Sequence, residues 1–249
     1  MAFRSLKFNS TNLVVAIASV TLLAACDSKG PSGTTVDDGS AKLSSKYDVN
    51  VYKLNQVVCD PFDNGSPADF NAGIKADLYS LSSDQPHYDH VQDYIDYGTK
   101  SEQTLFFTDM NVPTRKFDLG FPTETGEKVQ NDAGEDLHEY FALNMTTVLK
   151  LGPDDEPGLY ELALLSDDGS ILKLRNNQGV YEVVVDNDRN HPTKFGCSSE
   201  AIEFNEGTEI PAQILYYQGP RYHISMIPMW RKIDTAEDAG KDPQCGKYG

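Results

Sequence analysis

The sequence predicts an all-β fold, an antiparallel β-sandwich with loop insertions. Its apolar segments are short, and they either alternate with polar residues or run without interruption between turn residues. No segment keeps a sustained helical period, and no motif repeats at a fixed interval. Of the 249 residues, 39% are hydrophobic and 10% are aromatic, so the chain can bury the core that two facing sheets require.

The expected strands follow one another along the second part of the chain. In order, they are residues 73–79, 104–107, 140–151, 159–165, 170–174, 180–185, 201–204, 210–217 and 223–230, with a shorter strand at 56–58 before them. The segment 80–134 is rich in Asp, Gly, Pro and Tyr, which predicts loop, apart from a weak helical pattern at 88–97. Trp230 ends an apolar strand and is expected in the core.

The N-terminus carries a secretion signal. Residues 1–10 are basic, residues 13–25 are apolar, and the run ends in Leu-Ala-Ala-Cys at Cys26, which resembles the bacterial lipobox. An apolar run of about 13 residues is shorter than the roughly 20 that span a bilayer. The pattern therefore predicts a lipoprotein signal peptide at 1–25, with Cys26 as the lipidated first residue of a protein anchored in a bacterial cell envelope. Which membrane leaflet holds it stays open.

The rest of the chain divides by composition. Residues 26–50 are mainly small and polar, which predicts a flexible tether, and residues 234–249 form a polar C-terminal tail. One domain, at 51–233, lies between them. The net charge of −17 disfavours nucleic acid as a partner, because an acidic surface repels phosphate.

The order of several short motifs resembles a known family. The motifs are GIKADLY at 73–79, GLY at 158–160, LLSDDGS at 164–170, VVDND at 184–188, YYQG at 216–219 and IPMW at 227–230. Together they are similar to the protective-antigen (PA-14 type) β-sandwich domain of bacterial toxins, glycosidases and flocculin-type adhesins. The resemblance implies a jelly-roll-like sandwich from Gly73 to Trp230, although residues 80–136 do not visibly match the family.

The motif Asp167-Asp168-Gly169 has two interpretations. It can be a tight turn between paired strands, with glycine at the turn. Two adjacent carboxylates are unusual for a plain turn because they repel each other, and together they offer the oxygen ligands that calcium prefers. The resemblance implies that a cis peptide joins Asp167 to Asp168 and that both bind calcium. The sequence leaves both interpretations open.

The resemblance also implies that the loop at 218–221 completes the site. Gln218 would be the further metal ligand, where the adhesins have asparagine, and Tyr217, Gly219 and Arg221 would join the two aspartates in contacting a glycan. Of the adjacent tyrosines 216 and 217, strand alternation predicts that one faces the core and one faces out. The acidic cluster 186–188 has two interpretations, a solvated turn, which is favoured, and a calcium or glycan contact.

Three functions remain. The first is a calcium-dependent glycan-binding lipoprotein whose partner is a glycan or cell-surface polysaccharide. The second is a structural or protein-interaction module that contacts other envelope proteins and has no sugar site. The third is a hydrolase with an unrecognised site, but no Gly-x-Ser-x-Gly, His-Glu-x-x-His or Walker motif is present, and the chain is predicted not to be an enzyme.

The cysteines predict one disulfide. With Cys26 lipidated, Cys59, Cys197 and Cys245 remain, and an exported protein can oxidise two of them. Because domain termini often lie close together, Cys59–Cys245 is the expected pair, with Cys197 as the competing partner for either.

Overall fold

The computed structural model describes residues 4–5, 73–107, 109–123 and 126–248, all of which belong to one compact unit. The predictions for Cys26, the tether, the strand at 56–58 and Cys59 lie outside the described residues. Within the part that the structure describes, no helix is both long and apolar enough to cross a bilayer.

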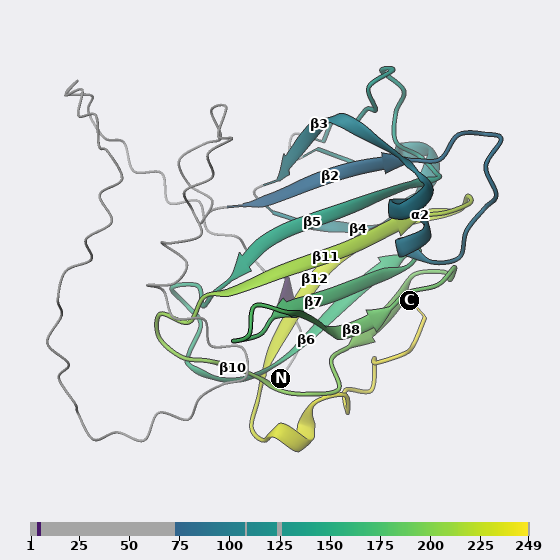
Figure 1. Cartoon of the computed structure of the whole chain (residues 1–249). Helices are drawn as coiled ribbons and strands as arrows, with labels where there is room; N and C mark the ends of the chain where they lie inside the picture. The colour runs from purple at the N-terminus through teal and green to yellow at the C-terminus, as the bar shows by residue number, and fades with distance from the viewer. Residues whose placement is uncertain (1–3, 6–72, 108, 124–125, 249) are drawn as a thin grey trace, which may run out of the picture. The chain divides into compact units, whose positions relative to one another are not determined.

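The fold is an antiparallel β-sandwich, as the sequence predicts. One sheet has the strand order β3-β2-β5-β11-β7-β8, and its first four strands run side by side in Figure 1. Its strands are β2 (Ile74–Ser80), β3 (Thr99–Phe107), β5 (Phe141–Leu149), β7 (Ser170–Arg175), β8 (Tyr181–Asn187) and β11 (Ile210–Gln218). All neighbours in this sheet pair antiparallel.

The second sheet faces the first. Its main order is β1-β12-β6-β10, with β4 also paired to β12 and β9 also paired to β6. Its strands are β1 (Arg4–Ser5), β4 (Val112–Lys116), β6 (Gly158–Asp167), β9 (Lys194–Cys197), β10 (Ile202–Phe204) and β12 (His223–Ile233). The short strand β1 falls inside the segment that the sequence predicts to be a signal peptide.

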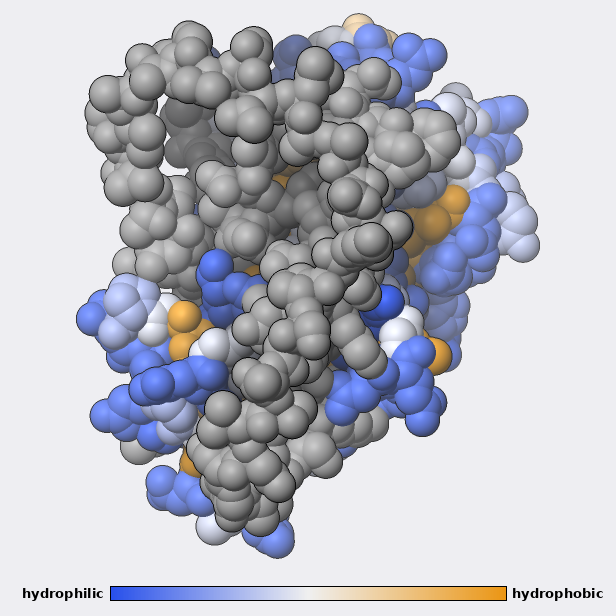
Figure 2. All heavy atoms as spheres, turned by 60° about the vertical axis from the view of Figure 1, so that its left-hand side comes forward, coloured by the Kyte–Doolittle hydropathy of each residue, from blue (hydrophilic) through white to orange (hydrophobic). Residues whose placement is uncertain are grey.

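The core lies between the two sheets and follows from the alternation of side chains along each strand. In β2 and β7, every second residue is buried, which is the pattern of a strand with one face on the core. Trp230 is buried against Tyr160 and Phe204, at ring-centroid distances of 4.9 and 5.3 Å, so its expected place in the core is confirmed. Figure 2 shows that the described part of one outer face is mostly hydrophilic, with small separate apolar spots.

The segment 80–134 contains more regular structure than the sequence predicts. The helix α2 (Val91–Tyr97) lies within the predicted helical stretch, but β3 begins five residues earlier than expected, and β4 and the 3-10 turn η1 (Phe117–Leu119) were expected as loop. The loop prediction was wrong for β4 because that strand has the sequence VPTRK and buries only its first residue fully. Because β4 is held by backbone pairing to β12, its sequence shows no hydrophobic alternation from which a strand could be predicted.

The C-terminal tail folds back onto the sheet beside β9. Cys197 in β9 forms a disulfide with Cys245, so the predicted pair Cys59–Cys245 is wrong and the competing partner is the correct one. The backbone N–H of Phe195 donates to the carbonyl of Lys247 at 2.9 Å, and that of Gly246 donates to the carbonyl of Phe195 at 2.6 Å. The tail therefore extends the edge of the sheet next to Cys197. The expected closeness of the domain termini, on which the pair Cys59–Cys245 was based, does not predict this position.

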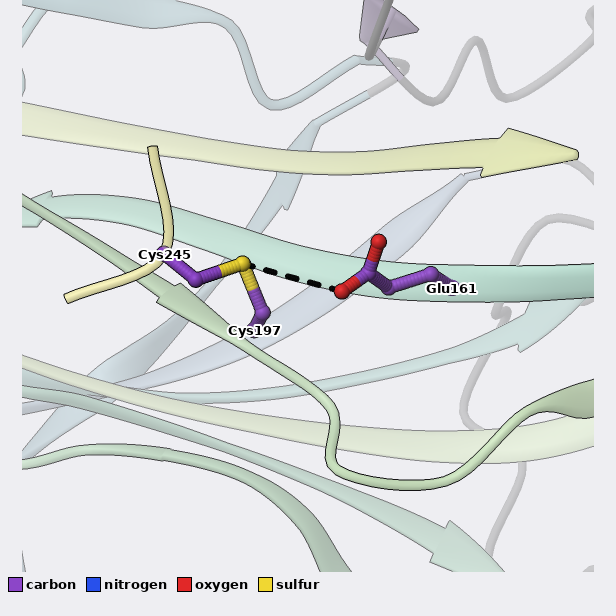
Figure 3. Close-up of side chains that lie close together, drawn as sticks. All are labelled: Glu161, Cys197 and Cys245. Atoms are coloured by element: carbon purple, nitrogen blue, oxygen red, sulfur yellow. Dashed lines mark hydrogen bonds between the residues drawn. A yellow bond between two sulfur atoms is a disulfide. The ribbon is translucent and has the colours of Figure 1, made fainter. Parts of the chain in front are cut away.

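A buried charge pair supports the same tail. The fully buried Glu161 accepts hydrogen bonds from Arg231 Nε at 2.5 Å and from the backbone N–H of Gly240 at 2.6 Å. Figure 3 shows its Oε1 atom pointing at Cys245 Sγ, 3.6 Å away. A disulfide sulfur carries no proton and is a poor metal ligand, and Arg231 already balances the carboxylate. This cluster is therefore structural.

We expect the disulfide to stabilise the domain by about 2–4 kcal/mol, because it closes a long loop of the unfolded chain. The double variant Cys197→Ser/Cys245→Ser should unfold at correspondingly lower urea concentration, and reductant should shift the wild type by the same amount but leave the variant unchanged. Equal unfolding midpoints for wild type and variant would contradict this assignment.

Candidate metal and ligand site

One end of the sandwich brings together the residues that the sequence singles out. Strand β6 ends at Asp167, β11 ends at Gln218 and β12 begins at His223. The backbone N–H of Gly219 donates to Asp168 Oδ2 at 2.8 Å, so the aspartate pair and the loop 218–221 do meet. The peptide bond between Asp167 and Asp168 is cis, as the resemblance implies.

The aspartate pair is not a turn between paired strands. Strands β6 and β7 belong to different sheets, so the chain crosses from one sheet to the other at residues 167–169. Gly169 is not among the glycines with positive φ. A Cβ at this position would stand 2.5 Å from the ring of Tyr217 and 2.7 Å from Asp188 Oδ1. Close packing, rather than turn conformation, therefore requires the glycine, and the tight-turn interpretation was wrong.

Both carboxylates are buried, and the basic side chains that act on them are histidines, since His223 and His191 oppose the rise in the pKa of Asp167. Asp167 is 5% exposed and Asp168 is 3% exposed. Asp168 Oδ1 accepts from the backbone N–H of His191 at 3.2 Å, and Asp167 Oδ2 accepts from the hydroxyl of Thr193 at 3.1 Å. Among the described residues, no lysine or arginine forms an ion pair with either carboxylate. The protein therefore holds two adjacent acidic groups out of water with few compensating charges.

Burial perturbs the titration of both groups. Desolvation raises the pKa of Asp168 to about 7, and the neighbouring charge of Asp167 adds to the rise, while the N–H groups of Gly219 and His191 oppose it. Burial also raises the pKa of Asp167, against the hydrogen bonds from Thr193. A cation placed between the two carboxylates would favour their ionised forms and so oppose both shifts.

Gln218 does not turn its amide oxygen toward the carboxylates. The Oε1 atom of Gln218 lies 2.7 Å from the hydroxyl of Tyr216, while Nε2 donates to the carbonyl of His223 at 2.9 Å and lies 3.5 Å from Asp168 Oδ2. The single hydroxyl proton of Tyr216 serves either Gln218 or the carbonyl of Asp167, 2.8 Å away. Metal ligation by Gln218 stays a prediction, and it requires the amide to turn.

Tyr217 is also inaccessible. Strand alternation points its side chain away from the core that contains Tyr216, but helix α2 covers that side of the sheet. The ring of Tyr94 stacks on the ring of Tyr217 with centroids 4.6 Å apart, and both side chains are fully buried. The expectation that one tyrosine of the pair faces solvent was therefore wrong, because the insertion supplies a second apolar cluster.

The accessible groups form a rim around this end. Arg221 is exposed and lies 3.6 Å from Glu139 Oε2, and Tyr222 is 80% exposed. The ring of Tyr140 stacks on His87 at 4.3 Å, and the backbone N–H of Tyr140 donates to the carbonyl of Gly219 at 3.4 Å. We call the three aromatic residues Tyr222, Tyr140 and His87, together with Arg221, the aromatic rim.

Backbone strain is concentrated at the same end. The described non-glycine residues with positive φ are Tyr140 at 60°, Arg189 at 116° and Tyr222 at 135°. Tyr140 bonds to Gly219, Tyr222 follows the loop 218–221, and the backbone nitrogen of Arg189 lies beside Gly169. Such conformations cost free energy and gather at functional sites.

Sequence reasoning missed the contacts that span long distances along the chain. Asp188 was interpreted as part of a solvated turn, yet its carboxylate accepts from the backbone N–H of Val91 at 3.0 Å and lies 2.8 Å from His90 Nδ1. Its neighbour Asn187 is buried and donates to Ser166 Oγ at 3.0 Å. No local pattern reveals such partners, which are 21 to 98 positions away.

Comparisons with known proteins give similar folds. No family model matches the chain, and no curated protein matches it. Solved structures that are similar include the PA14 sugar-binding domain from an RTX adhesin, at 14% identity over 72% of this chain and 99% of that one, with a TM-score of 0.44. The PA14 domain of the MpAFP antifreeze protein matches at 16% identity over 64% of this chain and 81% of that one, with a TM-score of 0.42.

A third similar structure is the A domain of epithelial adhesin 9 from Candida glabrata in complex with Galb1-4GlcNAc, at 12% identity over 68% of this chain and 86% of that one, with a TM-score of 0.40. At these values the likeness concerns the β-sandwich alone. The site is argued from its own contacts.

In a chelator, we expect the wild type to lose stability as pH rises from about 4 to 7. The folded state holds the Asp168 proton up to a pKa of about 7, against 3.8 unfolded, so it binds more protons than the unfolded state in this window. The loss attributable to Asp168 is of the order of 2–4 kcal/mol. Urea unfolding at pH 5 and pH 8 measures it, with Asp168→Asn as the reference. Identical pH slopes for the two proteins would contradict the perturbed titration.

Proposed function

We propose that this protein is a calcium-dependent glycan-binding module anchored in a bacterial cell envelope through Cys26. The observation that carries the proposal is the pair of adjacent buried carboxylates, Asp167 and Asp168, neither of which pairs with a lysine or arginine among the described residues. A buried carboxylate is costly unless a cation or several donors compensate it.

The donor set fits a hard divalent cation. Asp167 and Asp168 would hold the ion, because calcium takes oxygen ligands from carboxylates, carbonyls and water. Gly219 leaves a cradle in which an added Cβ would stand 3.1 Å from Asp168 Oδ2 and 3.5 Å from the hydroxyl of Tyr94. That hydroxyl is buried and has no hydrogen-bond partner in the part of the chain that the structure describes. When bound, the ion would supply positive charge that neutralises the pair.

The aromatic rim supports the glycan part of the proposal. Sugars are bound by an aromatic face that covers the apolar side of the ring and by polar groups that meet its hydroxyls. Tyr222 offers an exposed ring and Arg221 offers donors next to Gly219. Because Tyr217 is buried, we assign the sugar contact that was predicted for Tyr217 to Tyr222 instead. Galb1-4GlcNAc, the ligand in the adhesin complex named above, is a practical first probe.

A second candidate function rests on the same burial. With Asp167 and Asp168 only 5% and 3% exposed, the ion could stiffen this end of the sandwich without meeting a sugar. The module would then be structural or bind another envelope protein. Glycan-array binding that a chelator abolishes supports the first function. Calcium-dependent melting without any glycan hit supports the second, and substrate turnover by the purified protein would contradict both.

We expect calcium to raise the melting temperature of the wild type. At a calcium concentration 100 times the dissociation constant, the gain is about 2.7 kcal/mol, or roughly 5–10 °C for a domain of this size. Asp167→Ala should abolish the calcium response, whereas Asp154→Ala, which removes an exposed carboxylate elsewhere, should keep it. A wild-type melting temperature that is independent of calcium would rule out the site.

The anchoring proposal rests on the Leu-Ala-Ala-Cys pattern that ends at Cys26. Cys26→Ala removes the thiol that lipidation needs, so we expect that variant to leave the detergent phase in Triton X-114 partitioning and to lose its membrane association. Cys59→Ala serves as the matched control and should partition like the wild type. A Cys26→Ala protein that still entered the detergent phase would contradict the lipoprotein assignment.

A further inference from the structure

Tyr94 presents an unexplained polar group. Its side chain is fully buried in the small apolar cluster beneath α2, and its hydroxyl has no hydrogen-bond partner among the described residues. Buried hydroxyls in native proteins nearly always find a partner, and an exception points to a bound water or ion. Tyr94 comes from the segment 80–136, which does not match the PA-14 pattern, so the family resemblance does not account for it.

The hydroxyl lies near Asp168, with Gly219 and the ring of Tyr217 beside both groups. The point where a Cβ on Gly219 would stand is 3.5 Å from the Tyr94 hydroxyl and 3.1 Å from Asp168 Oδ2, so both groups border the same small space. Burial and the charge of Asp168 raise the pKa of Tyr94, which keeps the hydroxyl protonated and able to donate. A hydroxyl with no hydrogen-bond partner among the described residues thus lies near the Asp168 carboxylate.

Two further contacts fix α2 over this space. Asp188, the residue after β8, accepts from the backbone N–H of Val91, and its carboxylate lies against His90. The hydroxyl of Tyr217 donates to the carbonyl of Asp89 at 3.0 Å. In Figure 1, α2 lies across the ends of β5 and β11, on the same side as the loop that follows β11. The helix is therefore attached to the elements that surround the two aspartates.

We propose that α2 is a cap of the cation site and that the Tyr94 hydroxyl holds a water molecule bound to a hard divalent cation beside Asp168. This inference rests on the proposed function and adds a residue from the chain's own insertion to the site. Cation binding and helix docking then stabilise each other. The side of the ion that faces α2 is closed to sugar, so a glycan contacts the outer side, at Arg221 and Tyr222.

The test is calcium titration by calorimetry on the wild type, Tyr94→Phe and Tyr181→Phe. Tyr94→Phe keeps the ring stacked on Tyr217 and removes one hydrogen bond, so its calcium affinity should fall by about five- to tenfold. Tyr181→Phe, a tyrosine on the edge strand β8, should bind like the wild type. Hydrogen exchange at 91–97 should slow on adding calcium in the wild type and in Tyr181→Phe, and should slow less in Tyr94→Phe.

A second variant tests the same part of the site in a protein that keeps Tyr94, so the test does not depend on the folding of Tyr94→Phe. Gly219→Ala places a methyl group between the Tyr94 hydroxyl and Asp168, and it should weaken calcium binding with the tyrosine intact. Equal calcium affinity and equal exchange in wild type and Tyr94→Phe would overturn the role of Tyr94 and leave the calcium site standing. A wild type that binds no calcium would overturn the proposed function and this inference together.

Discussion

The end of the sandwich depends on how the protein accommodates the Asp168 carboxylate. The chain passes from one sheet to the other at this residue, and its carboxylate accepts the backbone N–H groups of Gly219 and His191, from two different loops. These bonds connect the crossover to the loop after β11 and to the segment before β9. These two backbone N–H groups organise the loops, but they compensate the charge of the buried Asp168 carboxylate only in part.

The insertion that carries α2 changes the surroundings of that charge. It covers Tyr217, adds the stacked ring of Tyr94, and is held by the Asp188 carboxylate at its start. The aromatic groups that reach solvent at this end are Tyr222 and the stacked pair of the partly exposed Tyr140 and the exposed His87. Enclosure strengthens electrostatic interactions at the carboxylates.

At the C-terminal tail, by contrast, a buried carboxylate has a compensating partner. Glu161 is as deeply buried as the aspartates, but Arg231 and the N–H of Gly240 compensate its charge, and the neighbouring disulfide closes the tail over it. Compensation by a partner, rather than burial, separates Glu161 from Asp168.

The sequence by itself determined the sandwich, nearly all of its long strands and the core position of Trp230, because these features follow from local alternation that one chain displays. The meeting of the aspartate pair with the loop after β11 was expected from the family resemblance and not from a local pattern. Tertiary structure decided the partner of Cys245, the burial of Tyr217 beneath α2 and the requirement for Gly169. Each of these depends on which segments pack against each other across many positions, and the physical cause is steric contact and burial that no local pattern encodes.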